Sequence, residues 1–335
     1  MYRMMLLAGI SLSFGLLSLM SIGGQASADE YPSAEISNGL IKMKLFLPDP
    51  EKGYYRGTRF DWSGVMPQLE YNGHNYFGEW KETHDPGVHD DIVGPVEEFK
   101  TRGTALGYDE AKPGETFVKI GIGLLEKIDE PDYRFSHPYK IIETGKWKVK
   151  SGADWITFQH DFSDESGWGY RYTKQIRLAR SRPEFTIEHK LKNKGLKHIE
   201  THQYNHNFFV IDGTPIGRDY VLRFPFEVEA KRDLKGIMET KGNELVFVKD
   251  LEEGSVFTEL EGFGDGAEDH EIVIENKKTG AGVRINGDTP IAQFNFWTIK
   301  ITVCPEPYIE LNIAPGDKVE WETKYTLYTI GEKSN

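Results

Sequence analysis

The sequence lacks the means to form an internal disulfide or a cysteine-rich metal site, because Cys304 is the only cysteine among its 335 residues. It is also short of positive charge: 40 Lys and Arg stand against 53 Asp and Glu, and the net charge is −13. This acidic balance argues against nucleic acid or an anionic membrane as the main partner. A hydrophobic content of 38% is typical of a globular chain, not a disordered one.

The first 28 residues are typical of a secretory signal. Arg3 supplies a positive start, residues 4–20 form an apolar stretch, and Ala26-Ser27-Ala28 is a small-x-small cleavage site. We therefore expect cleavage after Ala28 and a periplasmic or secreted protein with no membrane contact once the leader is removed. An uncleaved membrane anchor is the alternative, which the Gly and Ser residues within the stretch disfavour.

Beyond the leader, sustained helical periodicity is lacking, and apolar and polar residues alternate with a period of two. The alternation is clear in residues 156–162, 185–191 and 319–327, and it is the pattern of half-buried strands in antiparallel sheets. No low-complexity linker and no repeat of fixed period divides residues 29–335. We therefore predict a single all-β domain, a large antiparallel sandwich.

The segment from residue 200 to 213 is the first place where chemistry can be expected. If it is a strand, His202, Tyr204 and His206 share one face. An imidazole among aromatic rings could be an acid, a base or a sugar ligand. Two histidines four residues apart also invite a metal interpretation, but Gln203 stands where the helical zinc-protease motif has Glu. On pattern alone, a structural histidine inside the sandwich is favoured.

The second place is Glu306, which lies between Pro305 and Pro307 after an apolar strand. The two prolines make this carboxylate locally rigid. It is either a buried base with an adjusted pKa or an exposed turn residue, and the pattern alone favours the turn.

The third place combines His84 with His89, Asp90 and Asp91. Nitrogen and oxygen ligands of this kind could hold a metal ion. A solvated loop explains the same residues, and we prefer the loop, so we predict no metal site.

Several short motifs follow one another in the order and spacing of a known family. They are the strand succession 170–193, Asn205-His206-Asn207-Phe208-Phe209 with Asp212-Gly213, Val303-Cys304-Pro305-Glu306-Pro307, and Ile313-Ala314-Pro315-Gly316-Asp317 followed by Thr323-Lys324-Tyr325. With these motifs the chain, from about residue 167 to 330, resembles the galactose mutarotase-like superfamily, which includes aldose 1-epimerases and glucose-6-phosphate 1-epimerases.

The resemblance implies an antiparallel β-supersandwich with a carbohydrate in its site. It also implies that His206 is the catalytic acid and Glu306 the catalytic base. The carboxylate takes the proton of the anomeric hydroxyl while the imidazolium protonates the ring oxygen, so the ring opens and closes again on its other face. This chemistry requires no metal and no redox cofactor.

Further residues are candidates for contact with the sugar. For binding the substrate we name Arg59, Arg102, His202 and Trp297, and for stacking on a sugar face Trp62, Trp80 and Trp168. The family usually carries a second histidine before a glycine in its N-terminal third. Residues 90–99 hold no histidine, His89 lies close but out of register, and Arg102-Gly103 is the nearest related place.

The leading hypothesis is an exported, mutarotase-like isomerase that interconverts sugar anomers. Free sugars or the ends of oligosaccharides are the expected substrates, because phosphorylated hexoses are cytoplasmic metabolites. The alternatives are a carbohydrate-binding protein without turnover, and a polysaccharide lyase or glycoside hydrolase. Because all of these occur on similar sandwiches, the fold alone does not choose among them.

Overall fold

The computed structural model describes residues 31–331, so the predicted leader and its cleavage site lie outside the described residues. Within this range the chain is built of β-strands and loops, with two single-turn 3-10 helices, η1 (Ile211–Gly213) and η2 (Ala267–Asp269), and no α-helix. None of the described helices has the length and apolar character that a membrane crossing requires. The prediction of an all-β, antiparallel architecture is confirmed.

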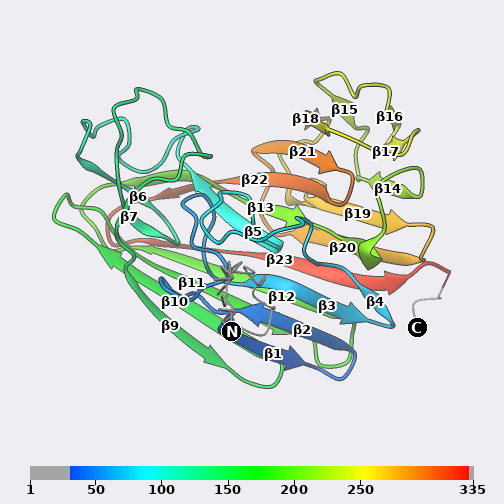
Figure 1. Ribbon diagram of the computed structural model, residues 1–335, viewed down its shortest axis with the longest axis horizontal. Coiled ribbons are helices and arrows are strands. Elements are labelled where there is room, and N and C mark those ends of the chain that lie inside the picture. Colours follow the sequence, from blue (N-terminus) through cyan, green and yellow to red (C-terminus); the bar gives the residue numbers. More distant parts are fainter. Residues whose placement is uncertain (1–30, 332–335) are drawn as a thin grey trace, which may run out of the picture.

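The larger layer is a ten-stranded antiparallel sheet; its strands β9, β10, β11 and β12 lie in the lower half of Figure 1, and β14, β16 and β17 lie at the upper right. Its order is β16-β17-β14-β19-β20-β23-β12-β11-β10-β9. The strands are β9 (Lys146–Ser151), β10 (Trp155–Ser163), β11 (Gly169–Leu178), β12 (Glu184–Asn193), β14 (Tyr220–Arg223), β16 (Met238–Lys241), β17 (Glu244–Phe247), β19 (Glu271–Asn276), β20 (Ala281–Gly287) and β23 (Lys318–Thr329).

The second layer is a six-stranded antiparallel sheet in the order β15-β18-β21-β22-β13-β5, and its strands β21, β22, β13 and β5 lie above β20 and β23 in Figure 1. Its strands are β5 (Gly94–Lys100), β13 (Ile199–Phe208), β15 (Glu229–Ala230), β18 (Ser255–Glu261), β21 (Gln293–Ile299) and β22 (Val303–Ile313). Two small sheets complete the fold: β1 (Ser33–Ser37), β2 (Ile41–Phe46), β3 (Val65–Tyr71) and β4 (His74–Asn75), and β6 (Thr116–Lys119), β7 (Gly123–Glu126) and β8 (Ile141–Glu143).

The strands predicted from alternation are present, and their apolar residues face the interior. In β10, β12 and β23 buried residues alternate with more exposed ones. Phe185 of β12 pairs with Tyr325 of β23, and their rings stack with centroids 4.5 Å apart. In these strands the alternation of apolar and polar residues therefore correctly predicts which face is buried.

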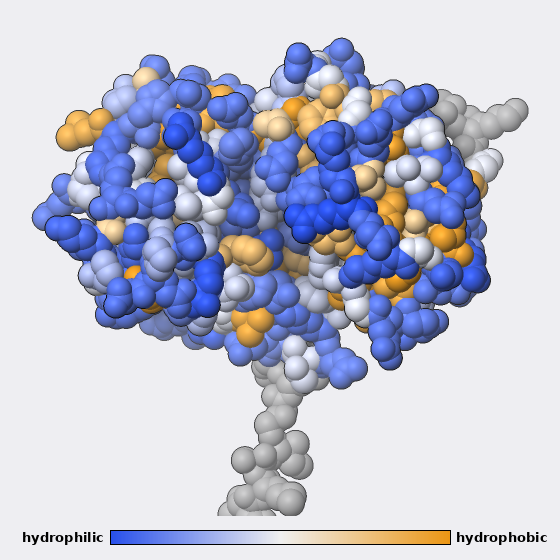
Figure 2. All heavy atoms as spheres, turned by 90° about the horizontal axis from the view of Figure 1, so that it is seen from above, coloured by the Kyte–Doolittle hydropathy of each residue, from blue (hydrophilic) through white to orange (hydrophobic). Residues whose placement is uncertain are grey.

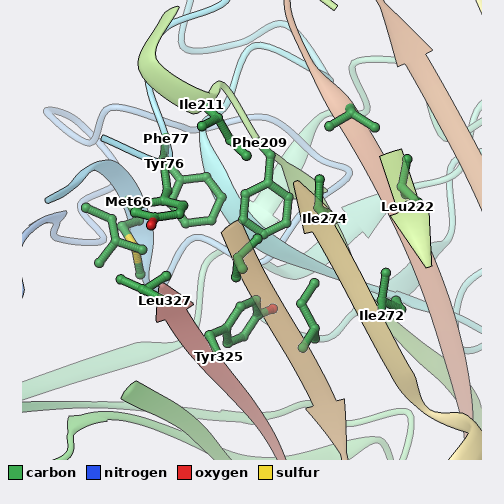
Figure 3. Packing of buried hydrophobic residues seen from close by; sticks show 14 of the residues in the cluster. Met66, Tyr76, Phe77, Phe209, Ile211, Leu222, Ile272, Ile274, Tyr325 and Leu327 are labelled. Atoms are coloured by element: carbon green, nitrogen blue, oxygen red, sulfur yellow. The ribbon is translucent and has the colours of Figure 1, made fainter. Parts of the chain in front are cut away.

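The main core lies between the layers and is apolar (Figure 3). Phe209 follows β13 and stacks on Phe77 with ring centroids 4.8 Å apart, while Ile274 of β19 and Leu327 of β23 are fully buried in the same cluster. Each large apolar side chain buried in this way stabilises the fold by about 1.5–3 kcal/mol. This core supports the six-stranded sheet from below.

Part of the interface between the two sheets is ionic. Lys174 of β11 lies 2.6 Å from Asp61 and 3.3 Å from Glu97, and His189 of β12 lies 2.8 Å from Glu97. Tyr172 also donates a hydrogen bond to Glu97. Buried charges are tolerated only when they are paired, and this network of five side chains joins β5 to the larger sheet.

Candidate active site

Neighbouring residues of β5 point to opposite faces of the six-stranded sheet. Glu97 points toward the larger sheet, where it contacts His189, whereas Glu98 contacts Arg59 and Lys119 on the other face. Tyr204 of β13 pairs with Glu98 and donates a hydrogen bond to it over 2.5 Å. The face that carries Glu98 is thus the one turned away from the core.

A cleft of about 300 Å³ lies on this face. Residues of the sheet that line it are His206, Phe208, Phe257, Asn295, Trp297, Glu306 and Tyr308. Its remaining lining residues are Arg59, His89, Asp90, Lys100 and Phe135, which come from β5 and from loops. Figure 2 looks down on this side of the molecule and shows the surface hollowed between two bulges.

His206 and Glu306 meet in the cleft because of the strand register. The pairing of Tyr204 with Tyr308 places His206 opposite Glu306, and a bridge between Phe209 and Val303 continues the same register. The Nε2 atom of His206 lies 3.0 Å from Oε1 of Glu306, and each side chain is 5% exposed. The two residues that the resemblance implied as acid and base are therefore in direct contact.

The expectation that Glu306 comes after the end of a strand is wrong. Glu306 lies inside β22, which is an interior strand of its sheet. The pairing of β22 with β13 stops at Tyr308 and resumes at Val303. Pro305 and Pro307 lack the N–H groups that a continuous ladder needs. The Asn207 side chain instead donates a hydrogen bond to the Pro305 carbonyl over 2.9 Å. The prolines thus open the ladder where the His206–Glu306 contact forms.

Burial changes the proton affinity of both groups. It raises the pKa of Glu306 to about 7, with Arg59 acting in the opposite direction. It lowers the pKa of His206 well below its usual value, and the positive charge of Arg59 adds to this effect. The Nδ1 atom of His206 is buried and has no hydrogen-bond partner among residues 31–331. Below about pH 7 the pair therefore holds one proton, which sits on Glu306.

Arg59 is fixed beneath the cleft by charge and by aromatic rings. Its Nε donates to Glu98 over 2.9 Å, and Nη2 donates to the Tyr204 hydroxyl over 3.1 Å. The guanidinium carbon lies 4.4 Å from the ring centroids of both Phe60 and Phe135. Burial alone would raise the pKa of Glu98, but Lys119 and Arg59 outweigh it and hold that pKa well below its usual range.

The other residues proposed to bind the substrate divide into two groups. Trp297 lines the cleft together with Arg59. Arg102 does not: its side chain is 77% exposed and pairs with Glu200 at 2.6 Å, in a separate surface depression. His202 lies on β13 beside Lys100 but is not part of the cleft lining.

The three tryptophans considered for stacking are buried instead. Trp62, Trp80 and Trp168 have exposed fractions of 2%, 9% and 8%, and none of them lines the cleft. Trp80 stacks on Phe208 with centroids 5.3 Å apart, so it supports the cleft floor from behind.

His84, His89, Asp90 and Asp91, which were considered as metal ligands, lie in two different environments. His84 uses both ring nitrogens within the fold, 2.9 Å from Asp91 and 2.8 Å from the Tyr54 carbonyl. His89 and Asp90 line the cleft. Among residues 31–331 no group of three or more His, Cys, Asp or Glu side chains is arranged to hold a metal ion.

Sequence reasoning missed several residues of the site. Glu98 and Lys100 belong to β5, whose charges hide its strand character. Asn295 and Tyr308 lie beside Glu306 only because of long-range register. For one lining residue, His89, the sequence did offer a signal, because it lies close to the place of the second histidine in the family that the chain resembles.

Comparison with solved structures identifies the fold. The chain is similar to the Slr1438 protein from Synechocystis sp. PCC 6803 (TM-score 0.57, 11% identity, covering 90% of this chain and 97% of that one). It is also similar to a homologue of GalM/aldose epimerase from C. elegans (0.55, 12%, 89% and 99%) and to a putative aldose 1-epimerase from Escherichia coli K12 (0.53, 13%, 89% and 99%). Searches with protein-family models and among curated proteins gave no match. The fold is that of the galactose mutarotase-like proteins.

Proposed function

We propose that this protein, which has a galactose mutarotase-like fold, binds a sugar in the cleft and interconverts its anomers. The observation that carries the proposal is the contact of His206 with Glu306 at 3.0 Å in a cleft lined by aromatic side chains. An acid and a base side by side can serve the two oxygens of one hemiacetal, because both oxygens are attached to the same carbon.

In the proposed reaction Glu306 accepts the proton of the anomeric hydroxyl, and His206 gives a proton to the ring oxygen. The bond between C1 and the ring oxygen breaks, and C1 becomes the carbonyl carbon of the free aldehyde. Rotation about C1–C2 turns the other face of the carbonyl toward the new hydroxyl. Closure reverses both proton transfers, so the residues return to their initial states.

The reactive pair differs from the resting pair in the position of one proton. Burial favours a protonated Glu306 beside a neutral His206. The reaction starts from the tautomer that carries this proton on His206. At 3.0 Å the proton can cross directly, and sugar hydroxyl groups that donate to the carboxylate stabilise the charged tautomer.

The test is to add the purified protein to a panel of freshly dissolved α-aldoses and to follow the anomeric NMR signals. The proposal expects faster equilibration, and a loss of roughly 100-fold or more in Glu306→Gln and His206→Asn. Glu320→Gln and His198→Asn change the same residue types at exposed positions and should keep the wild-type rate.

Three results would count against the proposal. Sugar binding without acceleration would leave a carbohydrate-binding protein. New reducing ends or unsaturated products from a polysaccharide would point to a hydrolase or a lyase. Equal activity in wild type and in Glu306→Gln would remove this pair from the mechanism.

We also propose that the chain is exported after cleavage behind Ala28, on the basis of the apolar stretch and the Ala26-Ser27-Ala28 site. Expression of the full chain in a Gram-negative host, followed by fractionation and N-terminal sequencing, tests this. The expected mature protein starts at Asp29. A full-length chain that stays in the cytoplasm would contradict export.

A further inference from the structure

Two cationic side chains of the cleft, Arg59 and Lys100, have N–H groups that are free to donate hydrogen bonds. Arg59 donates through Nε and Nη2 to Glu98 and Tyr204, but its Nη1 atom has no hydrogen-bond partner among residues 31–331. Lys100 reaches the cleft from β5 and has no ion pair within the described part of the chain; its Nζ lies 5.4 Å from the Phe135 ring centroid. Both groups can therefore donate to a ligand.

The surroundings of the cleft carry a surplus of positive charge. Arg59, Lys100 and Lys119 face one permanent anion, Glu98, which Lys119 and Arg59 share. Asp90 lies in the lining but is paired with Lys81 at 2.5 Å. A half-buried ammonium without a counter-ion is unfavourable. This surplus belongs to a chain with a net charge of −13, so it is a local property of the cleft.

We propose that the sugar bound in this cleft carries a carboxylate, which Lys100 and Arg59 bind through Nζ and Nη1. The inference rests on the proposed role of the cleft as a sugar site and names the substrate class, a uronate-type monosaccharide. A cleft of about 300 Å³ lies at the lower end of the range for small-molecule sites and suits a single sugar ring.

The acidic side chains already in the lining favour a carboxylate over a phosphate. A carboxylate has one negative charge, and its two oxygens can accept from one ammonium and one guanidinium edge. A phosphate monoester has nearly two charges at neutral pH, and it would lie in a lining that already contains Asp90 and Glu306. A monoanion therefore meets less repulsion in this lining than a dianion does.

The order of the strands matches the order of groups around a pyranose. In the sheet, β22 with Glu306 is followed by β13 with His206 and then by β5 with Lys100. In a pyranose uronate the anomeric oxygen is followed by the ring oxygen and then by the carbon that bears the carboxylate. Base, acid and cation therefore come in the sequence in which the substrate presents its three oxygen groups.

The experiment compares glucose, glucuronate and glucose 6-phosphate as substrates of the full protein. We expect kcat/KM for glucuronate to exceed that for glucose roughly 10- to 100-fold, because a hydrogen bond to a charged group contributes that much. In Lys100→Met this ratio should fall toward one. Lys100→Arg keeps the charge and should keep most of the preference, and Lys146→Met, at an exposed position, should not alter it.

Calorimetry of glucuronate binding to the Glu306→Gln variant separates this inference from the proposed function. Glucuronate binding that depends on Lys100, without turnover in the wild type, would support the inference and reject the isomerase. Equal use of glucose and glucuronate would overturn the inference and leave the isomerase intact. A preference for glucose 6-phosphate, or no binding of any of the three sugars, would also overturn it.

Discussion

Glu306 binds its proton more tightly in the folded chain than in the unfolded one. Burial raises its pKa from the usual 4.5 to about 7. Between these two pH values the unfolded chain loses the proton while the folded chain keeps it, so the stability of the fold decreases as the pH rises. The side chain that we propose as the catalytic base is therefore a source of instability above pH 7.

The variant Glu306→Gln should accordingly be more stable than the wild type in alkaline solution. Glutamine keeps the shape of the protonated acid and never ionises, so at pH 8 the gain should be on the order of 3 kcal/mol, since each pKa unit is worth about 1.4 kcal/mol. Urea unfolding at pH 8 and at pH 5 measures it. At pH 5, only half a unit above the usual pKa of 4.5, the difference should fall to about 1 kcal/mol or less, and an equal loss of stability at both pH values would contradict the argument.

The pH dependence of the proposed reaction follows from the same pair. The competent state holds one proton, and that proton is lost as the pH rises through about 7. We expect kcat/KM to decline above that pH and to stay level below it, down to the lowered pKa of His206. Polarimetry corrected for spontaneous mutarotation measures the profile. A rate that climbs through pH 7 and stays high would show that the carboxylate acts without the shared proton.

The sequence identified the members of the pair but not their contact. His206 and Glu306 stood out because each lies in a motif of the family, and Arg59 and Trp297 line the same cleft. Arg102 was chosen from its nearness in sequence to the family's histidine, and nearness in sequence does not place an exposed side chain. The distance of 3.0 Å depends on register between strands a hundred residues apart, which local pattern does not contain.

At the scale of the element, β22 is an interior strand with two prolines. Pro305 and Pro307 leave a gap in its pairing with β13, and Asn207 fills part of that gap. Asn207 also accepts a hydrogen bond of 2.8 Å from the Tyr325 hydroxyl of the larger sheet. One amide thus connects two strands of the upper sheet and the sheet beneath them.

Replacement of this amide should destabilise the fold. In Asn207→Ala the Pro305 carbonyl and the Tyr325 hydroxyl lose their partner inside the core, at a cost of about 2–4 kcal/mol for two unsatisfied groups. Tyr325→Phe removes one of the two interactions and should cost less. Chemical denaturation measures both, with Asn312→Ala as a control at an exposed position of β22. Equal stabilities of Asn207→Ala and the control would reject this role.

Alternation predicted the strands that are half buried and failed for those that are not. Residues 156–162, 185–191 and 319–327 lie in β10, β12 and β23 as expected. By contrast β5 is buried on both faces and yet carries charged residues, because an ion pair on each side compensates them. The segment around Glu306 contains prolines, which usually mark strand ends. Charged residues in β5 and prolines in β22 thus explain why the sequence pattern did not predict these two strands, which carry much of the cleft lining.

For the molecule as a whole, acid should act through the ionic network between the sheets. Burial alone would raise the pKa of Glu97, but His189 and Lys174 outweigh it and lower the pKa to about 2. Since the usual value is 4.5, this stabilisation is complete above pH 4.5 and is lost as the pH falls toward 2. Asp61, whose pKa is raised by burial, acts in the opposite direction and offsets part of the loss.

The melting temperature of the wild type should therefore fall steeply between pH 4.5 and pH 2. Glu97→Gln should start from a lower melting temperature at pH 7, because Lys174 and His189 lose their shared carboxylate, and should show a shallower fall. Glu200→Gln removes a carboxylate outside this network and should retain the wild-type profile. Scanning calorimetry at several pH values measures the three curves, and parallel curves for wild type and Glu97→Gln would exclude the network as the cause.

The adjacency of Glu97 and Glu98 in β5 has a consequence for how this protein tolerates genetic change. One carboxylate holds the two layers together while its neighbour holds Arg59 beneath the cleft. A single-codon deletion upstream in β5 would exchange the two directions and damage both tasks at once. In a deep mutational scan, abundance and activity scores should fall together along this strand, whereas at His206 and Glu306 activity alone should be lost.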